Sequence, residues 1–166
     1  MKPIFQNRWL RLSIYALAVA VPMFLTLALT GAESAGPVQQ KPASASHRLV
    51  LQINTDDPTT MKAVISTSVH LTKYYKAKNE GFSVQIVAYN AGLHMFRADT
   101  SPVQGLLQML RATNPEIGFV ICEATKLGMQ HAEGRTLTFV EGTTSTPNGP
   151  ARIIELQETG WSYLRS

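Results

Sequence analysis

The sequence predicts an α/β fold in which helices cover both faces of a mainly parallel, five-stranded sheet, as a three-layer α/β/α sandwich. Short apolar runs alternate along the chain with longer segments whose apolar residues recur at helical spacing. The short runs are nearly continuous, which is typical of parallel strands covered on both faces. Strands that alternate with helices favour right-handed crossovers, and these make neighbouring strands parallel.

The first 35 residues have the pattern of a targeting segment. Lys2, Arg8 and Arg11 precede residues 12–32, a run without any charged side chain. This order is typical of a secretory signal, but the run is also close to the ~20 residues that span a bilayer. We therefore expect residues 1–35 to be a signal peptide or an N-terminal membrane anchor. In either case the rest of the chain is expected in the periplasm or on the extracytoplasmic face of the inner membrane, with a possible inner-membrane tether.

Composition separates the leader from a single folded domain. Residues 36–47 are rich in Ala, Ser, Pro, Gly and Gln, which predicts a flexible linker, and residues 48–166 form the predicted domain. The chain has 15 basic and 11 acidic residues, and three of the basic residues lie in the leader. The remaining 12 basic residues nearly balance the 11 acidic ones. We therefore exclude a nucleic-acid-binding protein, because such a domain needs a basic surface.

Apolar spacing and helix-start signals locate the elements of this domain. Asp57 is expected to cap the first helix, with Pro58 in its first turn and Gly81 after its end. Further helices are predicted from Pro102 to Asn114, at residues 125–132, and from Pro150 to Gly160. Strands are predicted at residues 49–53, 84–89, 117–122, 137–140 and 161–164.

Ligands of open α/β sheets bind beyond the carboxyl ends of the strands, so a ligand site is expected in the segments that follow the strands. Residues 54–60 contain no glycine and include the carboxylates Asp56 and Asp57, which would repel phosphate. This excludes a dinucleotide site, a P-loop and a flavin phosphate site. A phospho-receiver domain would need an aspartate at the end of the third strand, where Cys122 stands.

Cys122 is the only cysteine of the chain, so no intramolecular disulfide can form. It closes an apolar strand and precedes a predicted helix, and a helix N-terminus stabilises a thiolate. Buried free cysteines also occur as small core residues, so a structural role stays open. The four histidines show no ligand spacing, and we expect neither a metal nor another cofactor.

Three segments of the predicted domain are similar to the DsrE/DsrF-like family of small α/β proteins. They are residues 51–58 (LQINTDDP), 120–125 (VICEAT) and 150–164 (PARIIELQETGWSYL). The resemblance implies a three-layer domain that assembles as a dimer, trimer or hexamer. It also implies a persulfide-carrying cysteine at Cys122, as in sulfur-relay members, although many members have no established activity. The chain departs from the family pattern at residues 126–129 and in the longer loop at residues 143–149.

Two functions therefore remain open. In the first, the chain is an exported homo-oligomer in which Cys122 accepts sulfane sulfur and passes it to a sulfur-transfer protein partner. Asn54, Asp56, His94 and Thr125 are then expected to form its ligand-binding pocket, and any activity is at most sulfur transfer. In the second, the domain is a non-catalytic ligand-binding or oligomeric assembly module with a structural Cys122.

Overall fold

The computed structural model describes residues 46–166, so the predicted leader and residues 36–45 of the predicted linker lie outside the described residues. A single sheet contains the five described strands in the order β4-β3-β2-β1-β5, and every neighbouring pair is parallel. The strands are β1 (Ser46–Ile53), β2 (Gly81–Ala88), β3 (Ile117–Cys122), β4 (Thr143–Thr146) and β5 (Ser162–Arg165). The helices are α1 (Pro58–Ala77), the 3-10 helix η1 (Asn90–Phe96), α2 (Gln104–Thr113), α3 (Glu123–Glu133) and α4 (Gly149–Glu158).

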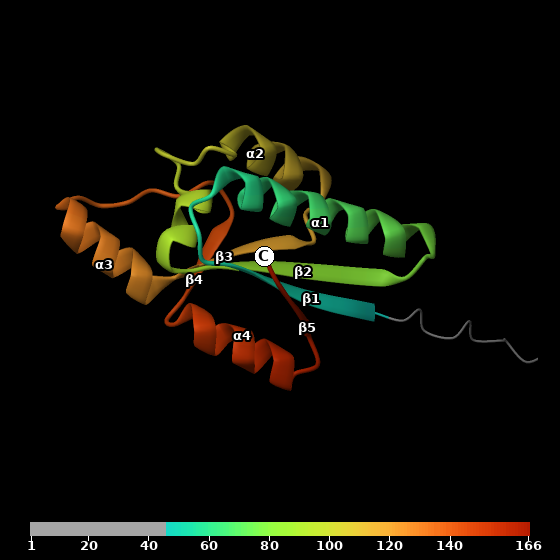
Figure 1. The fold of residues 1–166 in the computed structure, drawn as a ribbon. Coiled ribbons are helices and arrows are strands. Elements are labelled where there is room, and N and C mark those ends of the chain that lie inside the picture. The colour runs from blue at the N-terminus through green and yellow to red at the C-terminus, as the bar shows by residue number, and fades with distance from the viewer. Residues whose placement is uncertain (1–45) are drawn as a thin grey trace, which may run out of the picture. The chain divides into compact units, whose positions relative to one another are not determined.

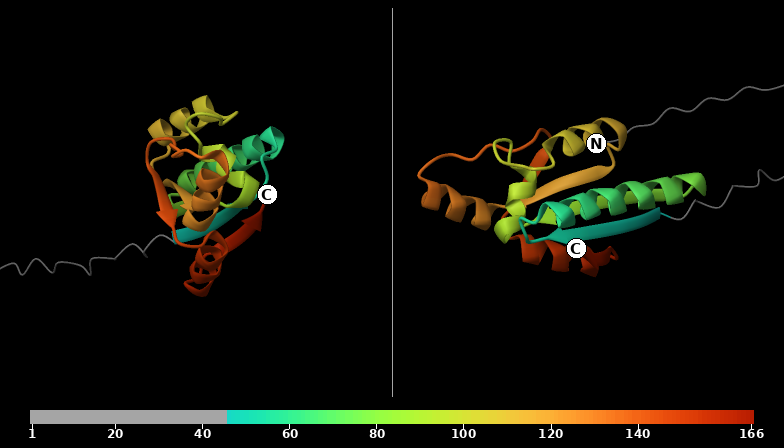
Figure 2. Two further views of the ribbon diagram at one scale, coloured as in Figure 1. Left: turned by 90° about the vertical axis from the view of Figure 1, so that its left-hand side faces the viewer. Right: turned by 45° about the horizontal axis from the view of Figure 1, so that its top comes forward.

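The helices lie on both faces of the sheet, which confirms the predicted fold class. Helices α1 and α2 cover one face and α4 covers the other, as Figure 1 and the two views of Figure 2 show. Helix α4 contacts β1, β2, β3 and β5. Helix α3 extends outward from the carboxyl end of β3 (Figure 1). No helix of residues 46–166 is long and apolar enough to cross a membrane.

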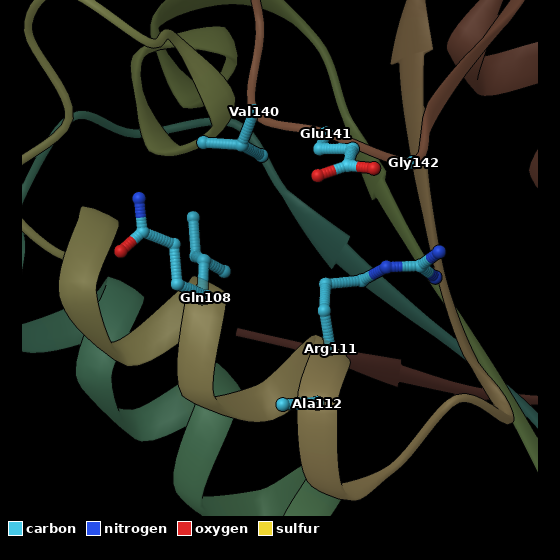
Figure 3. Close-up of a pocket in the computed structure, with 7 residues that line it drawn as sticks. Gln108, Arg111, Ala112, Val140, Glu141 and Gly142 are labelled. Atoms are coloured by element: carbon cyan, nitrogen blue, oxygen red, sulfur yellow. The ribbon is translucent and has the colours of Figure 1, made fainter.

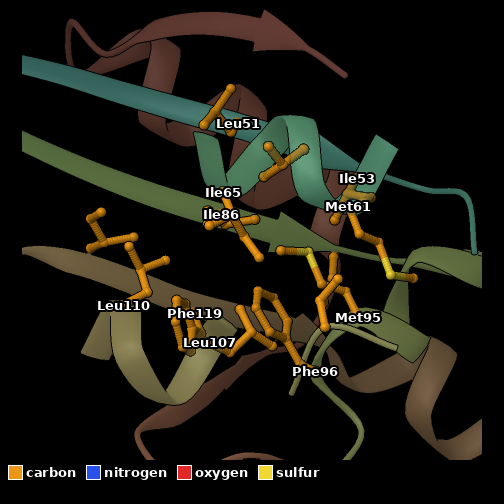
Figure 4. Packing of buried hydrophobic residues seen from close by; sticks show 14 of the residues in the cluster. Leu51, Ile53, Met61, Ile65, Ile86, Met95, Phe96, Leu107, Leu110 and Phe119 are labelled. Carbon is orange, nitrogen blue, oxygen red and sulfur yellow. The ribbon is translucent and has the colours of Figure 1, made fainter. Parts of the chain in front are cut away.

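Alternating side chains of the central strands fill two hydrophobic layers. On the α1 and α2 face, Ile86 and Phe119 belong to a large buried cluster with side chains of α1, η1 and α2 (Figure 4). On the other face, Val50, Val87 and Val120 pack with buried residues of α4. Because successive strand residues point to opposite faces, both layers need apolar residues, and this explains the continuous apolar runs of the sequence.

Helix α1 begins as predicted. The Asp57 side chain accepts a hydrogen bond of 2.8 Å from the Thr60 N–H, and Pro58 occupies the first turn. The chain then leaves the helix through Asn79, whose φ of 57° lies in the left-handed region, so Asn79 makes the turn that the sequence assigned to Gly81.

The predicted fourth strand at residues 137–140 is wrong, because β4 lies at Thr143–Thr146. Residues 138–140 instead meet residues 96–98 in an isolated antiparallel bridge between Arg97 and Phe139. Leu137 and Val140 are buried against the helical layer, which accounts for the apolar character of this segment. An edge strand contacts one neighbour only and can be polar, so β4 lacks the apolar run that predicts a buried strand.

Several further elements differ from those predicted. Residues 90–96 form η1, which the sequence did not predict, and α3 extends over Glu123–Glu133 rather than residues 125–132. Helix α2 begins at Gln104, two residues beyond the predicted proline start. These shifts lie at helix ends, where short polar side chains and 3-10 turns compete with the regular helix.

Candidate functional site

Cys122 lies where β3 ends and α3 begins. It is the last residue of β3 and the N-cap of α3, and its exposed fraction is 3%. The first residue of α4, Gly149, also approaches it. Two helix N-termini, from α3 and α4, therefore meet at one buried thiol, and each presents backbone N–H groups that no helical carbonyl satisfies.

Several hydrogen-bond donors surround the sulfur of Cys122. Burial by itself raises the pKa of the Cys122 thiol, but donors around the sulfur hold that pKa below its ordinary value. The donors are the Thr125 hydroxyl and the backbone N–H groups of Gly149, Thr125 and Ala124. These donors favour the charged form, because hydrogen bonds to the sulfur stabilise its negative charge.

Thr125 connects the thiol to the neighbouring strand end. Its Oγ1 accepts a hydrogen bond of 3.2 Å from the Asn90 N–H, which leaves the hydroxyl proton available to the sulfur. Asn90 has a φ of 48°, a left-handed conformation that asparagine tolerates better than most residues. The structure thus brings together two of the predicted site residues, Cys122 and Thr125.

The strand register aligns Asn54 with this site. Ile53 pairs with Ala88, and Ala88 pairs with Ile121, so the next residues on the three strands are Asn54, Tyr89 and Cys122. The Asn54 side chain hydrogen-bonds the Tyr89 hydroxyl. The pKa of Tyr89 nevertheless lies above its ordinary value. Burial is the main cause, and the nearby Tyr163 raises the pKa further. Tyr89 thus lies between Asn54 and the thiol.

The other two predicted site residues have different surroundings. Asp56 is exposed in the segment between β1 and α1. His94 lies in η1, where its Nδ1 is 3.3 Å from Thr100 Oγ1. Within residues 46–166, no hydrogen bond or ion pair joins Asp56 or His94 to Cys122.

The sequence did not predict Gly149 and Tyr89 as part of this site, although Gly149 packs against both Tyr89 and Cys122. A Cβ added to Gly149 would lie 3.2 Å from the Cys122 Cβ and 3.1 Å from the Tyr89 Cβ. The position of Tyr89 directly after the second strand was the available signal. Nothing in the local sequence ties Gly149 to a strand 27 residues away, because only the packing of α4 brings them together.

A charged cluster fixes the outer end of α3. Arg97 is 1% exposed, and its guanidinium donates to Glu133 at 2.9 Å (Nη2 to Oε2) and to Asp99 at 3.0 Å (Nε to Oδ1). Arg135 also pairs with Glu133, at 2.8 Å. Hydrogen bonds from Arg97 are the main cause that lowers the pKa of both carboxyl groups. Since α3 has no buried residue, these contacts are a principal restraint on its orientation.

A separate cavity of about 450 Å³ lies between α2 and residues 140–142. Figure 3 shows Gln108 and Arg111 projecting from α2 toward this segment. The Arg111 guanidinium lies 5.6 Å from the centre of the Phe119 ring and packs against Gly142, so it has a structural role there. The cavity contains none of the predicted site residues. The described residues also contain no group of three or more His, Cys, Asp or Glu side chains arranged to hold a metal.

Fold and site together define a small, all-parallel α/β domain with a buried thiol at the carboxyl edge of its sheet. No protein-family model matches the sequence, and no curated protein matches it. Among solved structures, the chain is similar to MTH1491, a protein of unknown function from Methanobacterium thermoautotrophicum, with 27% sequence identity and a TM-score of 0.61. The match covers 73% of this chain and 100% of that chain. This similarity supports the α/β fold and assigns no activity.

Proposed function

We propose that the domain is a sulfur carrier in which Cys122, as a thiolate, accepts sulfane sulfur as a persulfide. The observation that carries the proposal is the place of the thiol where the N-termini of α3 and α4 meet, beside donors that lower the pKa of the thiol. A buried cysteine in a merely structural role needs no such donors, because a neutral thiol is a weak hydrogen-bond acceptor. The resemblance of residues 51–58, 120–125 and 150–164 to the DsrE/DsrF-like family agrees with this function.

The chemistry requires only a thiolate and a sulfane donor, here a low-molecular-weight persulfide. The Cys122 thiolate attacks the outer sulfur of the donor R–S–SH, and a new S–S bond forms at Cys122. The S–S bond of the donor breaks, and the thiolate R–S⁻ leaves with the electron pair. Transfer onward is the same exchange with the thiolate of a partner protein as the attacking group. The donors that stabilise the thiolate also stabilise the persulfide anion, since both carry the charge on sulfur.

The test is to incubate the full chain with cysteine persulfide and to measure its mass. We expect the gain of one sulfur atom at Cys122 in the folded protein and no gain in Cys122→Ser. The rate at which iodoacetamide labels Cys122 should rise with pH around a midpoint below that of a cysteine in an unstructured peptide. Labelling that occurs only after unfolding in urea would show that the thiol does not react in the native fold.

The second candidate function is a non-catalytic ligand-binding or assembly module, and the 3% exposure of Cys122 favours it. In that case Cys122→Ala should lose roughly 1–3 kcal/mol of stability as a core residue. Under the sulfur-carrier proposal the same variant should keep most of its stability, since the donors around the sulfur can bond to water.

Assembly into a homo-oligomer is part of both proposals. The large exposed apolar side chains are Tyr74, Leu106, Met109, Leu127, Ile154 and Leu164. They lie on α1, α2, α3, α4 and β5, and surface of this kind favours self-association. Sedimentation of the full chain should give a species larger than the monomer at tens of micromolar, on the order of the concentrations at which weak interfaces form.

A further inference from the structure

The α4 face of the sheet is covered only in part, and a groove of about 280 Å³ lies beside α4. Helix α4 contacts β1, β2, β3 and β5, and the groove opens over β3 and β4. Its principal lining residues are Gln85, Gly118, Val120, Thr144, Thr146 and Arg152. It is lined by amide, hydroxyl and guanidinium groups around the apolar side chains of Val120 and Pro147, whereas the layer under α4 is hydrophobic throughout.

Arg152 supplies the charge of this groove. Its Nη2 donates to the Gln85 Oε1 at 3.3 Å, and its Nη1 lies 3.9 Å from the Glu155 carboxylate, beyond hydrogen-bond distance. A guanidinium carries five N–H donors in a planar fork, so most of those of Arg152 remain available to a ligand. Glu123, the other carboxylate near this end of the sheet, pairs with Lys126 at 2.7 Å through Oε1 and also hydrogen-bonds Ser145, a lining residue of the groove.

The strand register connects the groove to the thiol. Val120 and Cys122 point to the same face of β3, about 7 Å apart along the strand. Cys122 pairs in register with Thr146, and Val120 with Thr144, and both threonines line the groove. The groove therefore runs along β3 toward Cys122 and ends at residues 146–147, next to the helix start that donates to the sulfur.

We propose that this groove binds the carboxylate or sulfonate group of a small anionic ligand, whose other end extends along β3 toward Cys122. Arg152 bonds to the oxyanion through its fork, beside the Gln85 amide that it contacts. The proposed anion-binding site depends only on the residues of the groove and not on the chemistry of Cys122. The role of Cys122 toward the ligand rests on the proposed sulfur-carrier function, for which the ligand would be an anionic low-molecular-weight persulfide.

Binding is tested on the full chain by saturation-transfer NMR with propionate, ethanesulfonate and neutral propionamide. Propionate, ethanesulfonate or both should bind saturably to the wild type and to Cys122→Ala, and the pair distinguishes a carboxylate from a sulfonate site. Arg152→Gln should abolish the binding, Arg152→Lys should restore part of it, and Lys62→Gln on the opposite face should have no effect. Equal binding of propionamide, or unchanged binding in Arg152→Gln, would overturn the proposal.

The second measurement compares the rates at which iodoacetate and iodoacetamide alkylate Cys122 in the folded chain. The ratio of the two rates should fall about twofold in Arg152→Gln, as expected for the loss of a nearby positive charge that does not touch the reagent, and should not change in Lys62→Gln. If both reagents react and this ratio is unchanged in Arg152→Gln, the groove does not guide anionic ligands to Cys122. The proposal then fails, whereas the sulfur-carrier function is unaffected. If neither reagent reacts while propionate binding depends on Arg152, the anion site stands and the sulfur carrier fails.

Discussion

The backbone of Gly149 lies directly against Cys122, so close that a Cβ on Gly149 would come within 3.2 Å of the Cys122 Cβ. This contact joins the first turn of α4 to the end of β3 and lets the Gly149 N–H reach the sulfur. A side chain at this position would separate the two elements. The absence of a side chain at Gly149 is therefore a condition for the hydrogen bonds that stabilise the thiolate.

Gly149→Ala should lower stability by about 1–2 kcal/mol, because the new methyl group overpacks the junction with Cys122 and Tyr89. It should also raise the pKa of Cys122 toward its ordinary value, because the Gly149 N–H moves away from the sulfur. Urea unfolding and the pH dependence of iodoacetamide labelling measure the two effects. The matched control is Gly128→Ala in α3, where an added Cβ meets nothing within 4 Å, and which should gain up to ~1 kcal/mol. Wild-type values for both quantities in Gly149→Ala would contradict the contact.

Gly92→Ala should be more damaging than Gly149→Ala. The added Cβ would lie 2.2 Å from the Ile53 carbonyl oxygen, and neither backbone segment can move without displacing η1 or the end of β1. We expect a loss of about 3 kcal/mol or more, at the upper end of the range for overpacking. Thermal unfolding should show this loss. Gly105→Ala in α2, which has open space at the Cβ position, should retain its melting temperature or raise it.

Arg97→Met tests the charged cluster at the end of α3. The substitution keeps an apolar stem in the buried position but removes the donors to Asp99 and Glu133, and we expect a loss of about 2 kcal/mol. Arg135→Gln is the control, because its side chain is 50% exposed and its loss should be much smaller. Hydrogen exchange in α3 should accelerate in Arg97→Met, since α3 buries no side chain of its own. Equal exchange rates in the two variants would show that the charged cluster does not restrain α3.

The same cluster predicts how stability depends on pH. Arg97 lowers the pKa of Asp99 and Glu133 in the folded protein below their ordinary values of 3.8 and 4.5. Their stabilisation is therefore fully present above the unfolded-state pKa values and is lost as the pH falls through the folded-state values. Urea midpoints should be constant near neutral pH and should decrease below about pH 5. The decrease should be shallower in Arg97→Met, and a wild-type pH profile in that variant would refute the assignment.

The leader predicts export of the folded domain. Lys2, Arg8 and Arg11 followed by the uncharged residues 12–32 should direct the domain across the inner membrane. Protease added from the outer side of that membrane should digest the domain. Replacing all three basic residues by Gln should impair translocation or its direction. A domain accessible only from the cytoplasmic side would exclude export.

The sequence predicted most of the fold because the central strands are buried on both faces. Residues 49–53, 84–89 and 117–122 carry continuous apolar runs, and their strands were found where expected. Strand β4 was missed because an edge strand of threonines and serine carries no such signal. The apolar run at residues 137–140 does not mark a strand of the sheet. Its side chains are apolar because they are buried, and its backbone forms only an isolated bridge.

The candidate site was predictable only in part, for a related reason. The sequence places Cys122 at the carboxyl edge of the sheet because it ends a predicted strand. It places Thr125 nearby because Thr125 begins the predicted helix that follows. The proximity of Gly149 and the alignment of Asn54 with Tyr89 depend on strand register and on the packing of α4. These are relations between distant segments, and a single sequence without the register cannot specify them.

The two outer strands of the sheet have consequences for how copies of this domain can meet. Strands β4 and β5 each contain four residues, and they present mostly hydroxyl groups, with Arg165 at the end of β5. Short, polar or charged border strands discourage a strand from another chain from extending the sheet, which is the usual route to aggregation. An assembly of this domain is therefore expected to form through its helical surfaces, where Met109, Leu127 and Ile154 are exposed. In such an assembly, each strand would pair only with strands of its own copy.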